Sequence, residues 1–461
     1  KIFKCVNWKI LFLLLLVGWF GINILQSILT EMTEDETYYA FWGEQLAWGY
    51  YDHPPFVALM ASVSDWLFGG NLAVRFVTVF IQIIALCLVW KLLDEKAPSS
   101  PKVLLFFILP ASLFMFSAYG FITTADAPLL LFSALFLWMY QRFLKEESWT
   151  NMLLLGLSMA GMVYSKYHAV LIIGLIVLSN LRLLGRYKFW LAGLFTAVLL
   201  IPHLLWQISE GFPSFQYHLS ARSSSFRWNY FFEYIPNQLV VFNPLFVGVI
   251  IYILFKYKPR DIFERGLYVF IIGFVAFFWL MAFRGHVEPH WTVACSIPMM
   301  VLLYRRSLEN QKIFRFVKYG IAPFVILVFV ARILLITNIP PEKLHFHGKE
   351  SKYKALENLA GDCPVIFTGS FQNPSLYHFF TKKETTVLRR TTDRFTQFDI
   401  WQKEQAWKGK TVFVAGDVDA LTQCYTVDGY EFYGFFCNDF QLNNRNFEAI
   451  LCQPQILPAN D

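Results

Sequence analysis

The sequence predicts an α-helical polytopic membrane protein that ends in a small α/β domain outside the membrane, and three observations lead to this fold class. Of the 461 residues, 56% are hydrophobic and only 16% are charged, whereas a soluble globular domain carries about 25% charged residues. Apolar runs of membrane-spanning length recur from residue 9 to residue 337. After Pro340 and Pro341 the composition becomes that of a soluble domain.

The apolar runs predict about eleven transmembrane helices, because a helix needs roughly 20 apolar residues to cross a bilayer. The first run follows a basic start without a small-residue cleavage site, so we expect a retained span rather than a cleaved signal peptide. The approximate limits of the spans are 9–29, 72–92, 103–119, 126–141, 150–165, 168–184, 188–207, 236–255, 266–283, 291–304 and 314–337.

Basic residues divide the connecting loops into two sets. One set carries most of the Lys and Arg residues, and this asymmetry predicts a cytoplasmic location for that set. The first loop and the C-terminal region then lie outside. The basic excess therefore indicates topology and not nucleic-acid binding. Before the C-terminal region, the outer set holds only Lys166, Arg222, Arg227 and Arg284.

The chain is expected to form two domains, a membrane domain over residues 1–338 and a soluble α/β domain over 339–461. In the second domain, PVIFTG, TVFVAG and YEFYGFF read as strands, and segments near 372–381 and 399–408 read as short helices. Four cysteines of this domain would permit two disulfides in an oxidising compartment, with three pairings left open. They are Cys363, Cys424, Cys437 and Cys452.

The first outer loop, DETYYAFWGEQLAWGYYDHPP, is acidic and aromatic and lies beside membrane spans. Thr33 and Glu36 have the spacing of a capping box, so a helix is expected to begin here. Its aromatic residues are expected to lie along the membrane interface, and the segment 209–235 is expected to do the same.

Every outer loop brings polar or ionisable residues to the end of a span. A pore would instead line one helix face along its depth, so this pattern favours a cavity at the outer membrane surface. In order along the chain, these residues are Asp35, Glu36, Asp52, His53, Thr124, Asp126, Lys166, Tyr167, His168, His218, Arg222, Arg227, Arg284, His286, Glu288 and His290.

Carboxylates and scarce cations at one depth suit transfer of a group from a phosphate-linked lipid. A carboxylate can take the proton of an attacking hydroxyl. Cations can stabilise the charge that develops on the departing phosphate, and arginine can bind phosphate in a bidentate manner.

The loop DETYYAFWGEQLAWGYYDHPPFVALM resembles the first extracytoplasmic loop of GT-C superfamily membrane glycosyltransferases. The most similar branch contains protein O-mannosyltransferases and the lipid A aminoarabinose transferase. That family has an Asp-Glu pair after the first span, here Asp35 and Glu36, followed by Tyr39. TTADAPLLLF around Asp126, YSKYHAVL around Lys166 and VEPHW around Glu288 and His290 also resemble family segments. The resemblance covers most of residues 30–300 and weakens in the C-terminal domain.

The resemblance implies an inverting transferase in the bacterial inner membrane, with its active site facing the periplasm or cell exterior. It would move one hexosyl or pentosyl group from a polyprenyl-phosphate donor to lipid A, a glycan or a protein. Asp35 would be the catalytic base, and Asp126 would support acceptor or loop geometry. Glu36, Tyr39, Asp52, Glu288 and His290 would contact substrate or metal.

Asp52-His53-Pro54 departs from the family pattern, because the aminoarabinose transferase has a Lys where this chain has His53. The donor phosphate would then contact His53 together with Lys166, Arg222 or Arg284. A divalent cation held by Asp52 and a histidine, here His290, is the alternative way to neutralise the phosphate.

Simpler structural roles exist for several of these residues. Glu36 could be only the capping partner of Thr33, Asp126 a helix N-terminal acid, and Lys166 a side chain that extends to the interface. His203, within a span, is expected to be a buried, hydrogen-bonded histidine.

Two other functions compete with the transferase. A transporter or flippase of lipid-linked sugars would show polar residues within spans and broken helices near the midplane. A glycosidase with two carboxylates would use water as the acceptor, and the outer cations argue against it.

Overall fold

The computed structural model describes residues 7–217, 227–337, 339, 347–389, 393–416, 422–442 and 450–454. Its contacts divide the chain into two compact units. Unit 1 comprises Lys1–Leu29, Ala47–Gly49 and His53–Leu335, and unit 2 comprises Thr30–Leu46, Tyr50–Asp52 and Ile336–Asp461. Most of the first outer loop therefore belongs to the same unit as the C-terminal region.

Unit 1 is built from helices, and six of those described have the length and composition of membrane spans. A bent pair would make a seventh span. In this pair α12 (Trp228–Phe242) and α13 (Pro244–Lys256) meet at 102°. The six helices are α1 (Trp8–Leu29), α4 (Leu72–Leu92), α7 (Asp126–Lys145), α10 (Tyr187–Ser209), α14 (Ile262–Met281) and the run Gln311–Leu335, which contains α16 (Gln311–Phe316), the π-helical turn Val317–Ile321 and α17 (Pro323–Leu335).

The expected number of about eleven spans is not confirmed, because several expected spans are shorter or divided. The run 103–119 is interrupted at Leu113, whose extended backbone separates two helices. The run 168–184 forms one short helix followed by a 3-10 turn. The shorter helices of unit 1 are α3 (Phe56–Leu67), α5 (Ser100–Ser112), α6 (Phe114–Ala118), α8 (Trp149–Ser165), α9 (Ala169–Ser179), α11 (Pro213–Gln216) and α15 (Ser296–Glu309), with 3-10 turns η2 (Leu181–Gly185) and η4 (Pro289–Cys295).

A break in the chain at Asn243 explains the bent pair. Asn243 has a left-handed φ of 70°, and Pro244 follows it at the first position of α13. Proline cannot continue the hydrogen-bond ladder of the preceding helix but fits the first turn of a new one. The Asn243 side chain accepts the backbone N–H of Leu245 at 2.9 Å and so caps α13.

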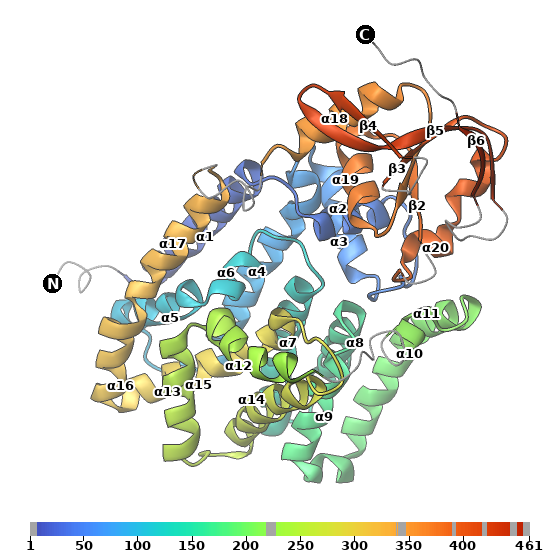
Figure 1. Cartoon of the computed structure of the whole chain (residues 1–461). Helices are drawn as coiled ribbons and strands as arrows, with labels where there is room; N and C mark the ends of the chain where they lie inside the picture. The colour runs from blue at the N-terminus through green and yellow to red at the C-terminus, as the bar shows by residue number, and fades with distance from the viewer. Residues whose placement is uncertain are drawn as a thin grey trace. The chain divides into compact units, whose positions relative to one another are not determined.

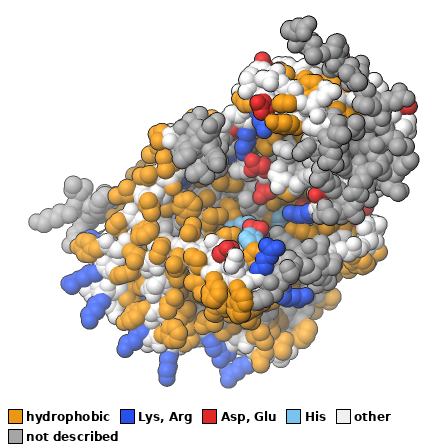
Figure 2. Space-filling view, in the orientation of Figure 1, with side chains coloured by type: hydrophobic (Ala, Val, Ile, Leu, Met, Phe, Trp, Pro, Cys, Tyr) orange, Lys and Arg blue, Asp and Glu red, His pale blue; other side chains and the backbone are white. Residues whose placement is uncertain are grey.

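The two ends of unit 1 differ in charge. Figure 2 shows hydrophobic side chains over its visible flank and Lys and Arg side chains along its lower edge. Lys145 lies at the end of α7, whereas Asp126 lies at its beginning. Similarly, Arg306 lies at the end of α15, and η4 with His290 lies before its beginning. This separation agrees with the loop asymmetry read from the sequence.

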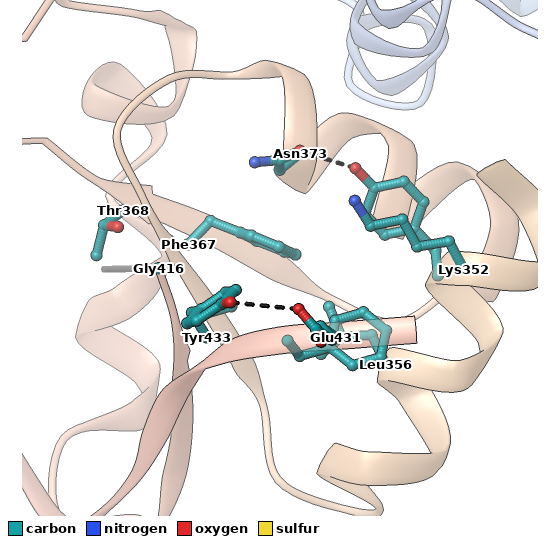
Figure 3. A pocket seen from close by; sticks show the side chains of 11 residues that line it. Lys352, Leu356, Phe367, Thr368, Asn373, Gly416, Glu431 and Tyr433 are labelled. Carbon is teal, nitrogen blue, oxygen red and sulfur yellow. Dashed lines mark hydrogen bonds between the residues drawn. The ribbon is translucent and has the colours of Figure 1, made fainter. Parts of the chain in front are cut away.

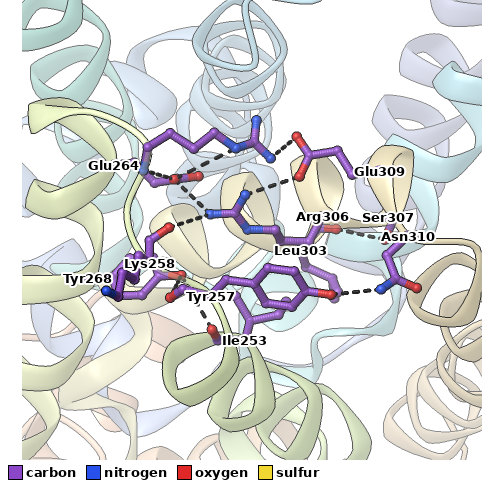
Figure 4. Close-up of polar contacts among 11 residues, drawn as sticks. Ile253, Tyr257, Lys258, Glu264, Tyr268, Leu303, Arg306, Ser307, Glu309 and Asn310 are labelled. Carbon is purple, nitrogen blue, oxygen red and sulfur yellow. Dashed lines mark hydrogen bonds and ion pairs between the residues drawn. The ribbon is translucent and has the colours of Figure 1, made fainter.

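A buried polar cluster holds α14 to α15 at the basic end (Figure 4). The Glu264 carboxylate, which is 0% exposed, accepts hydrogen bonds from Arg306 at 2.8 Å and from the backbone N–H of Arg260 at 2.7 Å. The Arg306 guanidinium also lies 5.1 Å from the ring centroid of Tyr257, whose hydroxyl accepts a hydrogen bond from Asn310. Because the buried charges are paired, they are compatible with the apolar surroundings.

Unit 2 contains a mixed sheet with strand order β2-β1-β3-β5-β4 and with β6 paired to β5 (Figure 1). β1 pairs in parallel with β2 and β3, and β5 pairs antiparallel with β3, β4 and β6. The strands are β1 (Val365–Thr368), β2 (Thr385–Leu388), β3 (Val412–Ala415), β4 (Gln423–Val427), β5 (Tyr430–Leu442) and β6 (Ile450–Pro454). The expected strands PVIFTG, TVFVAG and YEFYGFF correspond to β1, β3 and β5.

Helices complete unit 2. On one face of the sheet Phe367 contacts Tyr377 of α19, and on the other face Ile366 and Val414 form a buried cluster with Trp407 of η7. α19 and the α20–η7 pair correspond to the helices expected near 372–381 and 399–408. The helical elements are α2 (Glu34–Gly43), α18 (Lys349–Ala360), α19 (Gln372–Thr381), α20 (Gln397–Trp401) and the 3-10 turn η7 (Lys403–Trp407).

The cysteines of unit 2 do not form the two disulfides that the sequence allowed. Cys363 and Cys424 carry free thiols, whereas Cys437 is disulfide-bonded. Burial raises the pKa of the Cys363 thiol, with the negative charge of Asp362 acting in the same direction.

Candidate functional site

In unit 1 a buried ion pair joins Asp126 to Lys166. Asp126 is the first residue of α7, and Lys166 directly follows the last residue of α8. The Lys166 ammonium lies 2.8 Å from each carboxylate oxygen of Asp126. Their side chains are only 4% and 2% exposed. Lys166 therefore does not extend to the interface, and Asp126 largely neutralises its charge.

His290 brings a third candidate residue to this pair. Its Nε2 lies 3.7 Å from Oδ2 of Asp126, and its ring meets Tyr119 edge-on at 6.2 Å. The 3-10 turn η4, which begins at Pro289, holds His290 at the end of unit 1 that carries Asp126. The structure thus brings together Asp126, Lys166 and His290, which the sequence had placed in three different loops.

Several other candidate residues of unit 1 lie at its surface. His286 Nδ1 approaches the Glu288 carboxylate at 3.4 Å, and both side chains are partly exposed. Arg284 is exposed, as is Arg227 at the start of α12, which lies 5.9 Å from the Tyr230 ring. Arg222 and His218 lie outside the described residues.

His203 is buried and hydrogen-bonded, as the sequence predicted. Its Nδ1 lies 2.6 Å from the carbonyl oxygen of Trp48 and its Nε2 lies 3.1 Å from the Tyr167 hydroxyl. A carbonyl only accepts hydrogen bonds, so the proton belongs on Nδ1 and Nε2 accepts from Tyr167. Gln207 donates to Tyr167 and to Ser214, and this network fixes the loop after α8.

In unit 2, Asp35 lies at the rim of a pocket of about 590 Å³, which we call the Asp35 pocket. Asp35 is the second residue of α2 and is exposed. Other lining residues are Glu34 from α2, Lys349, Lys352 and Tyr353 from α18, and Asn373 from α19. This volume falls within the roughly 300–1,000 Å³ of small-molecule sites.

The sequence fixes the start of α2 through a capping box. The Thr33 hydroxyl accepts the backbone N–H of Glu36, and the Glu36 carboxylate accepts the backbone N–H of Thr33 at 3.1 Å. Glu36 is fully buried and so has the capping role that the sequence allowed. Tyr39, on the same helix, is buried and meets the Trp42 ring edge-on at 5.1 Å.

The expectation that the aromatic face of α2 lies along the membrane interface is wrong. Tyr38, Phe41 and Trp42 are at most 2% exposed. The ring centroid of Tyr38 lies 4.3 Å from that of Phe371, and the ring centroid of Phe41 lies 4.0 Å from that of His378. These rings meet protein within unit 2, because α19 provides the apolar surface that we had assigned to lipid.

Ion pairs attach α2 to the C-terminal part of unit 2. The Lys349 ammonium lies 2.9 Å from the Glu34 carboxylate, and His378 Nε2 lies 2.7 Å from the Glu44 carboxylate. Burial opposes the ionisation of Glu34, but hydrogen bonding and charge from Lys349 outweigh it and lower the Glu34 pKa. Burial likewise opposes ionisation of Glu44, and the contacts with His378 lower its pKa.

Asp52 is buried and forms an ion pair with Arg394 in unit 2. His53 belongs to unit 1 and is half-buried before α3. Among the residues that the structure describes, no group of three or more His, Cys, Asp or Glu residues could hold a metal ion. The Asp52 carboxylate is paired with Arg394, and a divalent cation held by Asp52 and His290 stays a prediction from the sequence.

Four residues of these contacts were not predicted as candidates from the sequence: Arg394, Lys349, Lys352 and Tyr353. Lys349 lies 315 positions from its partner Glu34, and Arg394 lies 342 positions from its partner Asp52. Lys352 and Tyr353 lie at a similar separation from Asp35, with which they line one pocket. A Lys-rich helix such as α18 is ordinary on the surface of a soluble domain. The sequence carried no local signal for these positions.

Comparisons with known proteins agree with this description. The sequence model of the dolichyl-phosphate-mannose-protein mannosyltransferase family matches residues 52–206. The crystal structure of ArnT from Cupriavidus metallidurans in the apo state has 14% identity and a TM-score of 0.65, with 93% of this chain and 97% of that chain covered. The same protein bound to undecaprenyl phosphate has 13% identity, a TM-score of 0.65 and the same coverage. No curated protein sequence matches the chain.

The resemblance to GT-C superfamily membrane glycosyltransferases is confirmed by these matches. The chain has the fold of ArnT over 93% of its length.

Proposed function

We propose that this chain, with its GT-C fold, is an inverting glycosyltransferase that moves a single sugar from a polyprenyl-phosphate donor to an acceptor hydroxyl. The mannosyltransferase family match and the structure of ArnT with undecaprenyl phosphate support this donor class. The observation that carries the proposal is Asp35, an exposed carboxylate at the rim of a pocket on a helix with a fixed start.

Asp35 acts as the general base. Its carboxylate takes the proton of the acceptor hydroxyl as the oxygen attacks the anomeric carbon. The new carbon–oxygen bond forms while the bond from that carbon to the phosphate oxygen breaks, and both electrons leave with the polyprenyl phosphate. Attack opposite the leaving group inverts the anomeric configuration. General base catalysis of this kind contributes roughly 10²–10⁴-fold to the rate.

Cationic side chains are the candidates for binding the donor phosphate, because they can stabilise its charge. Arg284 is exposed and suits a phosphate because its guanidinium can donate two parallel hydrogen bonds. His53 and Arg222 remain candidates from the sequence. Lys166 has a different role in this proposal, because its ammonium already holds both oxygens of Asp126. It positions the N-terminus of α7 and the neighbouring His290.

The enzyme is a multi-pass protein of the bacterial inner membrane and acts on the periplasmic or exterior side, as the distribution of basic residues favours. It transfers a hexosyl or pentosyl group, and the acceptor is lipid A, a glycan or a protein.

Replacement of the candidate base tests this function. Purified protein in nanodiscs is incubated with radiolabelled polyprenyl-phosphate sugars and with envelope lipids, glycans and proteins as acceptors. Asp35→Asn should lower transfer at least 100-fold at unchanged thermal stability, because the amide cannot accept the proton. Asp362→Asn, the same substitution at an exposed residue of unit 2 that does not line the pocket, is the matched control and should retain most activity. Full transfer by the Asp35→Asn protein would remove Asp35 from the mechanism.

A transporter or flippase of lipid-linked sugars is the second candidate, and the bent pair α12–α13 favours it. Charged residues of α4, α7 and α14 argue against it, because Arg75, Asp126 and Glu264 lie in the first turn of their helices and not at mid-span. Movement of a labelled polyprenyl-phosphate sugar between leaflets without product formation would support the transporter. Product formation without such movement would support the transferase.

A further inference from the structure

The connections between the parallel strands of unit 2 change direction between β1 and β3. The chain passes from β1 through α19 to β2 on one side, and then through α20 and η7 to β3 on the other side. In open α/β sheets, ligands bind outside the carboxyl ends of the strands at such a switch point, because the two outgoing loops separate there.

A pocket of about 360 Å³, which we call the strand-end pocket, lies at this position. Thr368 ends β1, Ala415 ends β3, and all three of Thr368, Ala415 and Gly416 line the pocket. Gly416 has a φ of +147°, and a Cβ added there would lie 1.8 Å from the Thr368 hydroxyl. Only glycine therefore allows these two loops to approach each other.

The strand-end pocket combines aromatic rings with hydrogen-bonding groups of both kinds (Figure 3). Tyr433 is 52% exposed and donates its hydroxyl to Glu431 at 3.3 Å. Asn373 accepts a hydrogen bond from the Tyr353 hydroxyl at 2.8 Å, and its amide nitrogen points away from that tyrosine. Lys352 from α18 adds an exposed ammonium.

The strand-end pocket adjoins the Asp35 pocket. Lys352, Tyr353 and Asn373 line both. Both pockets lie within unit 2, and we refer to the adjoining pair as the groove. A ligand longer than one ring would therefore contact the strand ends and the candidate base at the same time.

We infer that this groove binds a saccharide of the acceptor, with the strand-end pocket holding sugar rings next to the hydroxyl that is presented to Asp35. Sugar hydroxyls both donate and accept hydrogen bonds, so they match the carboxylate of Glu431 together with the amide of Asn373 and the ammonium of Lys352. The apolar face of a sugar ring suits the exposed ring of Tyr433. This inference rests on the proposed transferase function for the role of Asp35, whereas saccharide binding itself does not depend on it.

Saturation-transfer NMR on the full-length protein in nanodiscs tests the binding. The probes are neutral trisaccharides of glucose, mannose and galactose. At least one of them should receive saturation from the protein, and Tyr433→Ala and Lys352→Ala should each reduce the signal at least fivefold. Lys354→Ala is the matched control, because Lys354 lies on the same helix, is exposed and lines neither pocket. This control should leave the signal unchanged.

The failure of this inference can be distinguished from failure of the proposed function. Asp35→Asn should still bind the trisaccharide, because the amide can hydrogen-bond the presented hydroxyl, although this variant transfers no sugar. Absence of saturation transfer to every probe, or an equal signal in the Tyr433→Ala and Lys352→Ala proteins, would overturn the saccharide site even if Asp35 proved essential. Binding that depends on Tyr433 and Lys352, with full transfer by Asp35→Asn, would support the site and overturn the base.

Discussion

Breaking the buried pair of Asp126 and Lys166 should destabilise unit 1 more than removing both charges together. Lys166→Met leaves a carboxylate that is 2% exposed without its ammonium, and Asp126→Asn leaves the ammonium without its carboxylate. Removal of one partner of a buried pair costs about 3–5 kcal/mol, because the remaining charge stays desolvated. His290 lies 3.7 Å from Asp126 and can partly replace Lys166. The cost of Lys166→Met should therefore be the smaller of the two.

The cost in free energy of unfolding can be expressed as a shift in the unfolding temperature, Tm. With an unfolding entropy of about 2.1 cal/mol/K per residue, a unit of roughly 300 residues should lose about 5–8 °C in Tm for 3–5 kcal/mol. The double variant Asp126→Asn/Lys166→Met leaves no unpaired charge, and neutral replacement of a buried pair is often nearly without cost. We therefore expect its Tm within about 2 °C of the unaltered protein.

Circular dichroism of the protein in nanodiscs, recorded at one fixed heating rate, measures these shifts. Lys145→Met is the matched control, since Lys145 pairs with Asp94 at 2.7 Å but is 59% exposed. Exposed pairs contribute about 0–1 kcal/mol, so this variant should hardly change Tm. A double variant whose destabilisation equals the sum of the two single variants would refute the reasoning, because the two charges would then act independently.

Two further predictions concern α2. Thr33→Ala removes the capping hydroxyl and should cost about 0.5–2 kcal/mol of local stability, seen as faster amide hydrogen exchange in residues 34–43, whereas Thr381→Ala on α19 should leave this segment unchanged. The folded pKa values of Glu34 and Glu44 lie below the ordinary 4.5, so their stabilisation of α2 should be complete above about pH 4.5 and be lost as the pH falls through the lowered values. Hydrogen exchange, corrected for its intrinsic pH dependence, should show this loss of stability in α2. An equal loss in the Glu34→Gln/Glu44→Gln protein would show that it does not come from ionisation of these two glutamates.

Local patterns in the sequence predicted much of the fold. Apolar runs located the long helices of unit 1, alternation located β1, β3 and β5, and the spacing of Thr33 and Glu36 located the start of α2. These features depend on residues that are close in sequence. The number of spans was harder to predict, because hydropathy does not show where a helix is interrupted, as at Leu113 and Asn243.

The candidate site was predictable as a set of residue types but not as a set of contacts. The sequence named Asp126, Lys166 and His290, yet their pairing depends on how α7, α8 and η4 pack. The partner of Asp52 was not predictable, because Arg394 lies 342 positions away and arginine is common on soluble domains. The prediction for the aromatic face of α2 was wrong because aromatic residues also mark membrane interfaces, and the sequence does not show that α19 covers them.

The membership of α2 in unit 2 has a consequence for biogenesis. The Tyr38 hydroxyl accepts the backbone N–H of Gln397, and these residues are 359 positions apart. At a synthesis rate of about 5–20 residues per second, α2 waits roughly 20–70 s for the segment against which it folds. The packing around the helix that carries Asp35 is therefore completed only after residue 397 has been synthesised. A product that ends before residue 397 would lack these contacts to α2, even though its first helices had already formed.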